Sequence, residues 1–161
     1  PVVRQFEQPR NRDVALVVEL WQPAEPTLAQ RENVELAVSF AATVVADLCR
    51  RGGSDLLLAT AADGPSVTQG PASAALMHSM MEQLSVVEAH AEDHLPKLLV
   101  ETLRRIDPGT EVVLVSTRPV RLDDAARFAG AASEPNRRAS LRRARAIDVS
   151  QGDLEAYYRA S

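Results

Sequence analysis

The sequence predicts an α/β layer fold with a mostly parallel sheet and one short antiparallel edge strand. Apolar runs rich in β-branched residues alternate with longer segments of helical periodicity, which is the order expected of parallel strands joined by helices. The runs are almost continuously apolar, as in strands buried on both faces. One run leads through Asp-Gly-Pro into a short polar segment, which is typical of a hairpin at the edge of a sheet.

The first apolar run, residues 14–18, predicts a central strand that ends at Glu19. Pro23 and Pro26 then forbid ladder pairing and helix continuation, so the chain must turn there. Ligands of open α/β sheets usually bind outside the carboxyl ends of the strands, and this places Glu19 at a candidate site. Residues 1–12, before the strand, are expected to form an extended arm.

A long helix is predicted over residues 28–51, which carry a continuous apolar stripe at helical spacing. Thr27 is the expected N-cap, with Gln30 in the place of its capping-box partner. Gly52 and Gly53 supply the expected stop.

The middle of the chain predicts a second strand at residues 54–62 and a short polar strand at residues 66–69. A second helix is expected to start with Pro71 at its first position and to end near Val87. Residues 95–106 predict a third helix, stopped by Asp-Pro-Gly.

The last third predicts a core strand within residues 111–119 and a short helix at residues 122–132. Residues 133–143 are interpreted as a loop or frayed turn, residues 144–149 as a last short strand, and residues 152–158 as a closing helix. The strand order is left open.

Composition excludes several classes of protein. A length of 161 residues predicts one domain, and a single cysteine, Cys49, excludes a disulfide within the chain. No apolar run approaches the ~18 residues that span a bilayer, and no signal peptide is present, so these residues are expected to make no membrane contact. The chain starts at Pro1 without an initiator Met, which suggests a fragment of a longer protein.

Charge is unevenly distributed along the chain. Residues 1–117 carry 9 basic and 16 acidic side chains, whereas residues 118–161 carry 9 basic and 6 acidic ones. This mildly acidic body argues against nucleic acid as a partner. The strongest charge feature is a five-arginine segment, expected to be either a solvated face or a grip for an anion: Arg137, Arg138, Arg142, Arg143 and Arg145.

The segment VVRQFEQPRNRDVALVVEL, followed by the long helix and the strand SDLLLATA, resembles the bacterial domain of unknown function 58 family. Arg4, Phe6 and Glu7 stand in the places of that family's Arg-x-Phe-Glu segment. The resemblance implies a three-layer, Rossmann-like von Willebrand factor A-like domain over residues 13–161. It also implies a cytoplasmic location, upstream helices that tether the full protein to the inner membrane, and a partner among the MoxR-type AAA ATPases.

Domains of this kind often carry a metal-ion-dependent adhesion site, built from a DxSxS motif, a Thr from a later loop and an Asp after the fourth strand. Laid on that pattern, the Asp position is Glu19, and the two Ser positions are Trp21 and Pro23. The Thr position is Asp93 and the last Asp is Thr117. Mg²⁺ prefers oxygen ligands, so an indole and an imino ring in place of two hydroxyls predict a degenerate site with no cofactor.

Two further metal hypotheses come from the residues themselves. A rearranged site that uses Glu19, Asp93, Ser116 and Thr117 would make the chain a metal-dependent binder or hydrolase. His90 and His94 stand at an i, i+4 spacing, but a zinc protease needs Glu directly after the first His, where this chain has Ala. The short acidic segment around them is therefore expected to be solvated.

The sequence is best interpreted as a protein interaction module without catalysis, since no phosphate-binding or hydrolase-elbow motif is present. The loops at residues 19–26, 88–94 and 116–121 are expected to converge as its working rim. Trp21 could be a core residue or a partner anchor there. The candidate partner-binding residues are Glu19, Trp21, Gln22, Asp93, Ser116, Thr117 and Arg118.

Overall fold

A five-stranded sheet forms the centre of the molecule, with strand order β3-β2-β1-β4-β5. The computed structural model describes residues 12–62, 64–152 and 154. β1 is parallel to both β2 and β4, β4 is parallel to β5, and β3 is antiparallel to β2 at the edge. The elements are β1 (Val14–Glu19), α2 (Leu28–Arg51), β2 (Asp55–Ala61), β3 (Pro65–Pro71), α3 (Ala74–Ser85), α4 (Leu95–Arg105), β4 (Glu111–Ser116), α5 (Pro135–Arg143), β5 (Arg145–Asp148) and a final 3₁₀ turn, Val149–Gln151.

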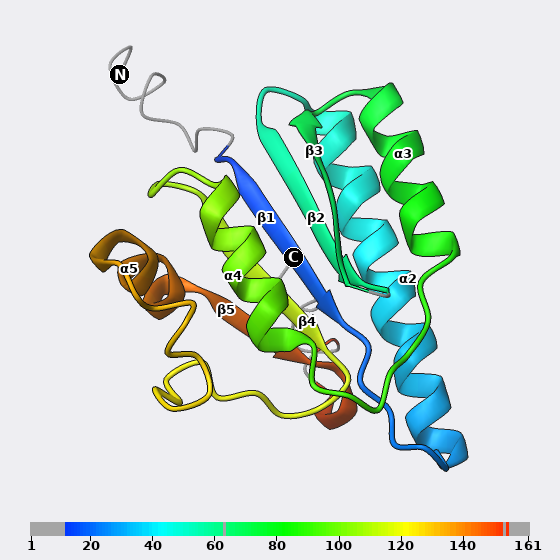
Figure 1. Cartoon of the computed structure of the whole chain (residues 1–161). Helices are drawn as coiled ribbons and strands as arrows, with labels where there is room; N and C mark the ends of the chain where they lie inside the picture. Colours follow the sequence, from blue (N-terminus) through cyan, green and yellow to red (C-terminus); the bar gives the residue numbers. More distant parts are fainter. Residues whose placement is uncertain (1–11, 63, 153, 155–161) are drawn as a thin grey trace.

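Helices cover both faces of the sheet, with α2 and α3 on one side and α4 and α5 on the other (Figure 1). Successive side chains of a strand point to opposite faces, so β1 contributes Leu16 and Val18 to the first core and Ala15 and Val17 to the second. This three-layer, Rossmann-like arrangement confirms the predicted fold class, including the antiparallel edge strand.

The expected central position of the first strand is also confirmed, because β1 lies between β2 and β4. The carboxyl ends of these three parallel strands therefore share one edge of the sheet. In the β1–β4 register, Glu19 stands opposite Ser116 at that edge.

Helix α2 occupies the range that the sequence predicts, and its ends explain why. The Gln30 backbone N–H donates to Thr27 Oγ1 at 3.1 Å, and the Thr27 N–H donates to Gln30 Oε1 at 2.9 Å, so the capping box is complete. The helix stops at Gly52, whose φ of 68° is a conformation that glycine adopts without strain.

The predicted start of the second helix is wrong. Pro71 is the last residue of β3, where it pairs with Asp55, and Ser73 caps the helix instead by accepting from the Leu76 N–H at 3.0 Å. The hairpin is longer than its polar sequence indicates, and an edge strand tolerates a proline at its end.

Residues 122–132 were expected to be a helix, and this prediction is wrong. They form successive turns, with isolated helical bonds such as Phe128 N–H to Asp124 O at 3.1 Å. Phe128 and Ala131 are both 1% exposed in the second core, so tertiary burial of two side chains replaces a continuous helical ladder.

The loop expected at residues 133–143 is also wrong, because α5 occupies most of it. Pro135 suits the first turn of this helix, and burial of Ser140 and Leu141 holds it on the sheet. The expected arm at residues 1–12 and the closing helix at residues 152–158 lie almost wholly outside the described residues.

Among the helices of the described residues, none has the length and apolarity that crossing a membrane requires.

Candidate functional site

The three predicted rim loops meet at the carboxyl edge of the sheet. An isolated parallel bridge joins Trp21 to His90: the His90 N–H donates to Leu20 O, and the Gln22 N–H donates to His90 O, both at 2.9 Å. This single bridge joins the segment after β1 to the 88–94 loop. We call the joined segments at residues 19–26, 88–94 and 116–121 the rim.

Glu19 is the buried centre of the rim, with only 5% of the residue exposed. Ser116 Oγ donates to Glu19 Oε1 at 2.7 Å, as their opposed register positions allow. Arg118 donates from Nε to Oε1 at 3.2 Å and from Nη2 to Oε2 at 2.8 Å. This bidentate contact is the geometry in which a guanidinium binds a carboxylate most strongly.

Asp93 links the buried pair to the surface. It accepts from Arg118 Nη2 at 2.8 Å and from Arg127 Nε and Nη2 at 3.0 and 2.8 Å. The Arg127 hydrogen bond, reinforced by the charges of Arg127 and Arg118, holds the pKa of Asp93 below its usual value against some burial. The same hydrogen bond raises the pKa of Arg127. Two carboxylates and two guanidiniums therefore form one charge-balanced network, which we call the ionic cluster: Glu19, Asp93, Arg118 and Arg127.

Trp21 is half-buried beside this cluster. Its indole N–H donates to Ala91 O at 2.9 Å, and the Arg118 guanidinium lies 4.8 Å from the ring centroid, a cation–π contact. Thr117 Oγ1 donates to Trp21 O. Gln22 is also half-buried and is placed by its backbone bond to His90.

The residues at this edge do not fit a Mg²⁺ ion. Both oxygens of Glu19 and both of Asp93 accept from arginine, and the Ser116 and Thr117 hydroxyls donate to Glu19 and to a main-chain oxygen. All four side chains of the rearranged metal site are therefore already hydrogen-bonded within the protein. The Arg118 guanidinium lies between the two carboxylates. A hard dication would have to displace a cation that already satisfies both groups.

Sequence reasoning missed Arg127, which completes the cluster. This residue falls in the segment expected to be a short helix, and its position depends on the burial of neighbouring Phe128. Two acidic residues of the expected rim, Glu19 and Asp93, against one basic candidate there, Arg118, were the available signal, because a buried carboxylate needs a counter-ion.

The five-arginine segment does not join the rim. Arg145 at the start of β5 pairs with Glu111 at the start of β4, which is the opposite edge of the sheet. Arg143 donates to Pro108 O at 2.5 Å, and Arg138 donates to Ala132 O at 3.3 Å. At least these three arginines have acceptors within the domain.

The predicted solvated loop is only partly solvated. His90 and His94 do not share a helical face, since His90 precedes α4 and His94 caps it, and both are half-buried. The side chain of Glu92 between them is 75% exposed.

Comparison with known proteins adds no family to these observations, since no protein-family model matches the chain and no curated protein matches its sequence. The class that the structure defines is a three-layer, Rossmann-like α/β domain with an ionic cluster at the carboxyl edge of its sheet.

Proposed function

We propose that this chain is a non-catalytic protein interaction module of the von Willebrand factor A-like kind, with a degenerate metal-ion-dependent adhesion site. The observation that carries the proposal is the Arg118 guanidinium between Glu19 and Asp93, at the sheet edge where such domains hold their ion. A fixed internal cation there replaces an exchangeable one, so recognition by the rim needs no metal at this position.

The rim has features that suit a protein partner. The Asp93 side chain is 42% exposed and anchored on two arginines, while half-buried Trp21 lies next to it under the Arg118 guanidinium. Tryptophan and arginine are enriched among residues that dominate binding energy, and preorganised side chains lose little freedom on binding. The partner inferred from the family resemblance is a MoxR-type AAA ATPase, with the full protein tethered to the inner membrane on its cytoplasmic side.

The same contacts favour a module without catalysis. Ser116 is 1% exposed, and its hydroxyl donates to a carboxylate that already binds Arg118. A nucleophile needs a base that can take its proton, and a carboxylate held by guanidinium is a poor one.

A binding assay against a purified MoxR-type ATPase tests the proposal. We expect Trp21→Ala, Asp93→Ala and Arg118→Ala each to weaken binding at least about tenfold, the scale of an interface hot spot. Arg145→Ala, at the opposite edge of the sheet, is the matched control and should bind as the wild type does. Undiminished binding by all three rim variants would overturn this assignment of the surface.

A titration with Mg²⁺ or Mn²⁺ separates the module from the alternative, a metal-dependent binder or hydrolase. We expect no heat and no change in melting temperature, because the oxygen donors of Glu19 and Asp93 are engaged by arginine. Saturable heat that disappears in Glu19→Gln would favour the alternative.

A further inference from the structure

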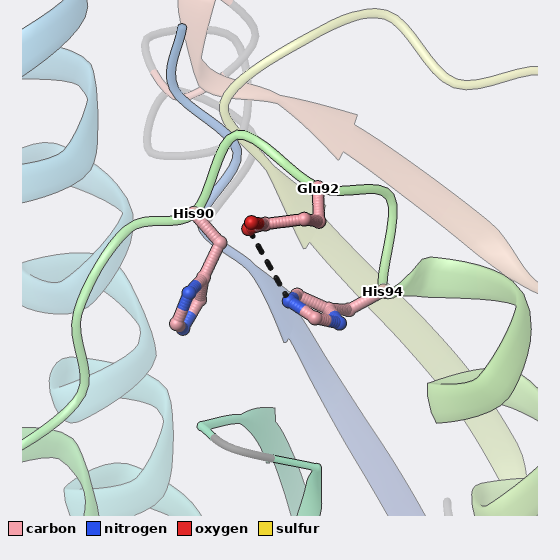
Figure 2. A group of neighbouring side chains, drawn as sticks. All are labelled: His90, Glu92 and His94. Carbon is pink, nitrogen blue, oxygen red and sulfur yellow. Dashed lines mark ion pairs between the residues drawn. The ribbon is translucent and has the colours of Figure 1, made fainter. Parts of the chain in front are cut away.

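Three metal-ligating side chains of the 88–94 loop point toward one another (Figure 2). One ligand atom from each of His90, Glu92 and His94 can be chosen so that all three lie within 4.8 Å of one another. His94 Nε2 lies 3.9 Å from Glu92 Oε2, and the two imidazoles meet edge to face with centroids 4.9 Å apart.

One of these atoms lacks a partner. His90 Nε2 is buried and has no hydrogen-bond partner among the described residues. Buried polar atoms are nearly always paired, so an unpaired one in a native fold needs an explanation, such as an ion.

The loop that carries the three side chains is fixed by its own backbone. His90 is bonded at both main-chain groups to the segment after β1, Ala91 O accepts from the Trp21 indole, and His94 O accepts from the Leu98 N–H in the first turn of α4. The side chains of residues 90, 92 and 94 thereby gather in one place, as Figure 2 shows. The Asp93 carboxylate instead accepts from Arg127 in the ionic cluster. Such a scaffold reduces the ordering that a metal would otherwise impose.

We propose that His90, Glu92 and His94 bind a divalent transition-metal ion of the Zn²⁺ class. Two imidazole nitrogens and one carboxylate oxygen are ligands that Zn²⁺ takes, with a fourth position open to water, and hard cations such as Mg²⁺ disfavour them. The carboxylate comes two residues after the first histidine, so the HExxH requirement that excludes a zinc protease does not bear on this site.

The space between the ligands suits one ion. A small cavity of about 10 Å³, close to the room that one water molecule needs, is bordered by the three ligand residues together with Glu88, Glu19 and Trp21. Tetrahedral zinc with bonds near 2.0–2.1 Å puts its ligand atoms about 3.3 Å apart, so the present separations, all within 4.8 Å, must shorten by at most about 1.5 Å. Glu92 is 75% exposed and free to rotate inward, and its exposure also gives an ion a path of entry.

The ligands of this site and the members of the ionic cluster are different residues, so metal binding can be measured separately from partner binding. The two sites are neighbours, since Glu19 and Trp21 border the same cavity as the three ligands. An ion there would clamp the 88–94 loop and hold Asp93 in place against Arg127.

The test is a calorimetric titration of the full 161-residue chain, free of any histidine tag, with ZnCl₂. We expect one-to-one binding, and titration with CoCl₂ should give the visible absorption bands of tetrahedral Co²⁺. His90→Ala, His94→Ala and Glu92→Gln should each weaken binding more than about tenfold, since even outer-shell changes cost 10- to 100-fold.

His78→Ala is the matched control. His78 is the third histidine, lies 77% exposed on α3 and pairs with Glu82 at 2.9 Å, so its loss should leave Zn²⁺ affinity unchanged. Melting curves of the metal-free variants confirm that each one folds. No saturable binding by the wild type, or equal weakening by His78→Ala, would overturn the site. Neither result would affect the binding assay with the ATPase.

Discussion

Two neighbouring sets of side chains at the 88–94 loop differ in how their charges are balanced. In the first set, Asp93 and Glu19 are neutralised by Arg118 and Arg127, so the cation is part of the chain. In the second set, Glu92 lies near two imidazoles, and His90 Nε2 has no protein partner among the described residues. Charges that are neutralised within the chain suit recognition of a partner by shape and fixed charge. Ligand atoms without a protein partner suit the binding of an exchangeable ion.

Removal of the internal cation gives the largest expected effect on stability. Arg118→Met retains much of the side-chain packing but leaves the Glu19 carboxylate, 6% exposed, with the Ser116 hydroxyl as a donor and with Arg127 3.8 Å away. Breaking a buried pair from one side costs about 3 kcal/mol of unfolding free energy, measurable by urea denaturation. Arg121→Met is the control: this arginine is 84% exposed and pairs with Asp123, so its loss should cost under about 0.5 kcal/mol.

A double variant sharpens this result. Glu19→Gln combined with Arg118→Met should lose less stability than the sum of the two single variants, because no buried charge is left unpaired. A strictly additive result would mean that the two side chains do not depend on each other.

Binding of Zn²⁺ to His90, Glu92 and His94 gives the next largest effect on stability. Zn²⁺ at 100 times its dissociation constant should add about 2.7 kcal/mol to the unfolding free energy, since it binds the folded state. In His90→Ala, whose affinity should fall more than about tenfold, the gain at the same Zn²⁺ concentration should drop to about 1.4 kcal/mol or less, whereas His78→Ala should keep it in full, as thermal melts would show. An undiminished gain in His90→Ala would place the ion elsewhere.

Substitution of Trp21, which contacts both the 88–94 loop and Arg118, gives a smaller effect on stability. Trp21→Phe keeps a ring under Arg118 but removes the indole donor to Ala91 O. We expect a loss of about 1 kcal/mol in unfolding free energy, the net value of one hydrogen bond. A loss of several kcal/mol would instead assign Trp21 to the core rather than to the binding surface.

The smallest effect is the pH dependence of Asp93. Its folded-state pKa lies below the ordinary 3.8, so its stabilising contribution is present above that value and is lost as the pH falls through the folded pKa. The melting temperature of the wild type should therefore exceed that of Asp93→Asn at pH 7, and the two should converge below about pH 4. The gap is modest because solvent screens a side chain that is 42% exposed. A gap unchanged at pH 3 would contradict the ionic role of Asp93.

Local patterns predicted the first half of the fold well. The apolar run at residues 14–18 and the Thr27 cap are encoded by neighbouring residues, so β1 and α2 have the expected places. The segments at residues 122–132 and 133–143 were predicted in the wrong states, because burial of Phe128 and Leu141 against α4 and the sheet overrides weak local preference.

The sequence by itself determined a mostly parallel sheet with its candidate site beyond Glu19, because periodicity and proline positions are local properties. It also predicted that the loops at residues 19–26 and 116–121 would meet at that edge, since parallel strands end together, and that the loop at residues 88–94 would face them. Only the tertiary structure decided what the site is. Arg118 and Arg127 reach Glu19 and Asp93 across 99 and 34 residues of sequence separation. His90 is placed by its backbone, which pairs with the segment after β1. Such contacts depend on packing between distant elements, which no local pattern encodes.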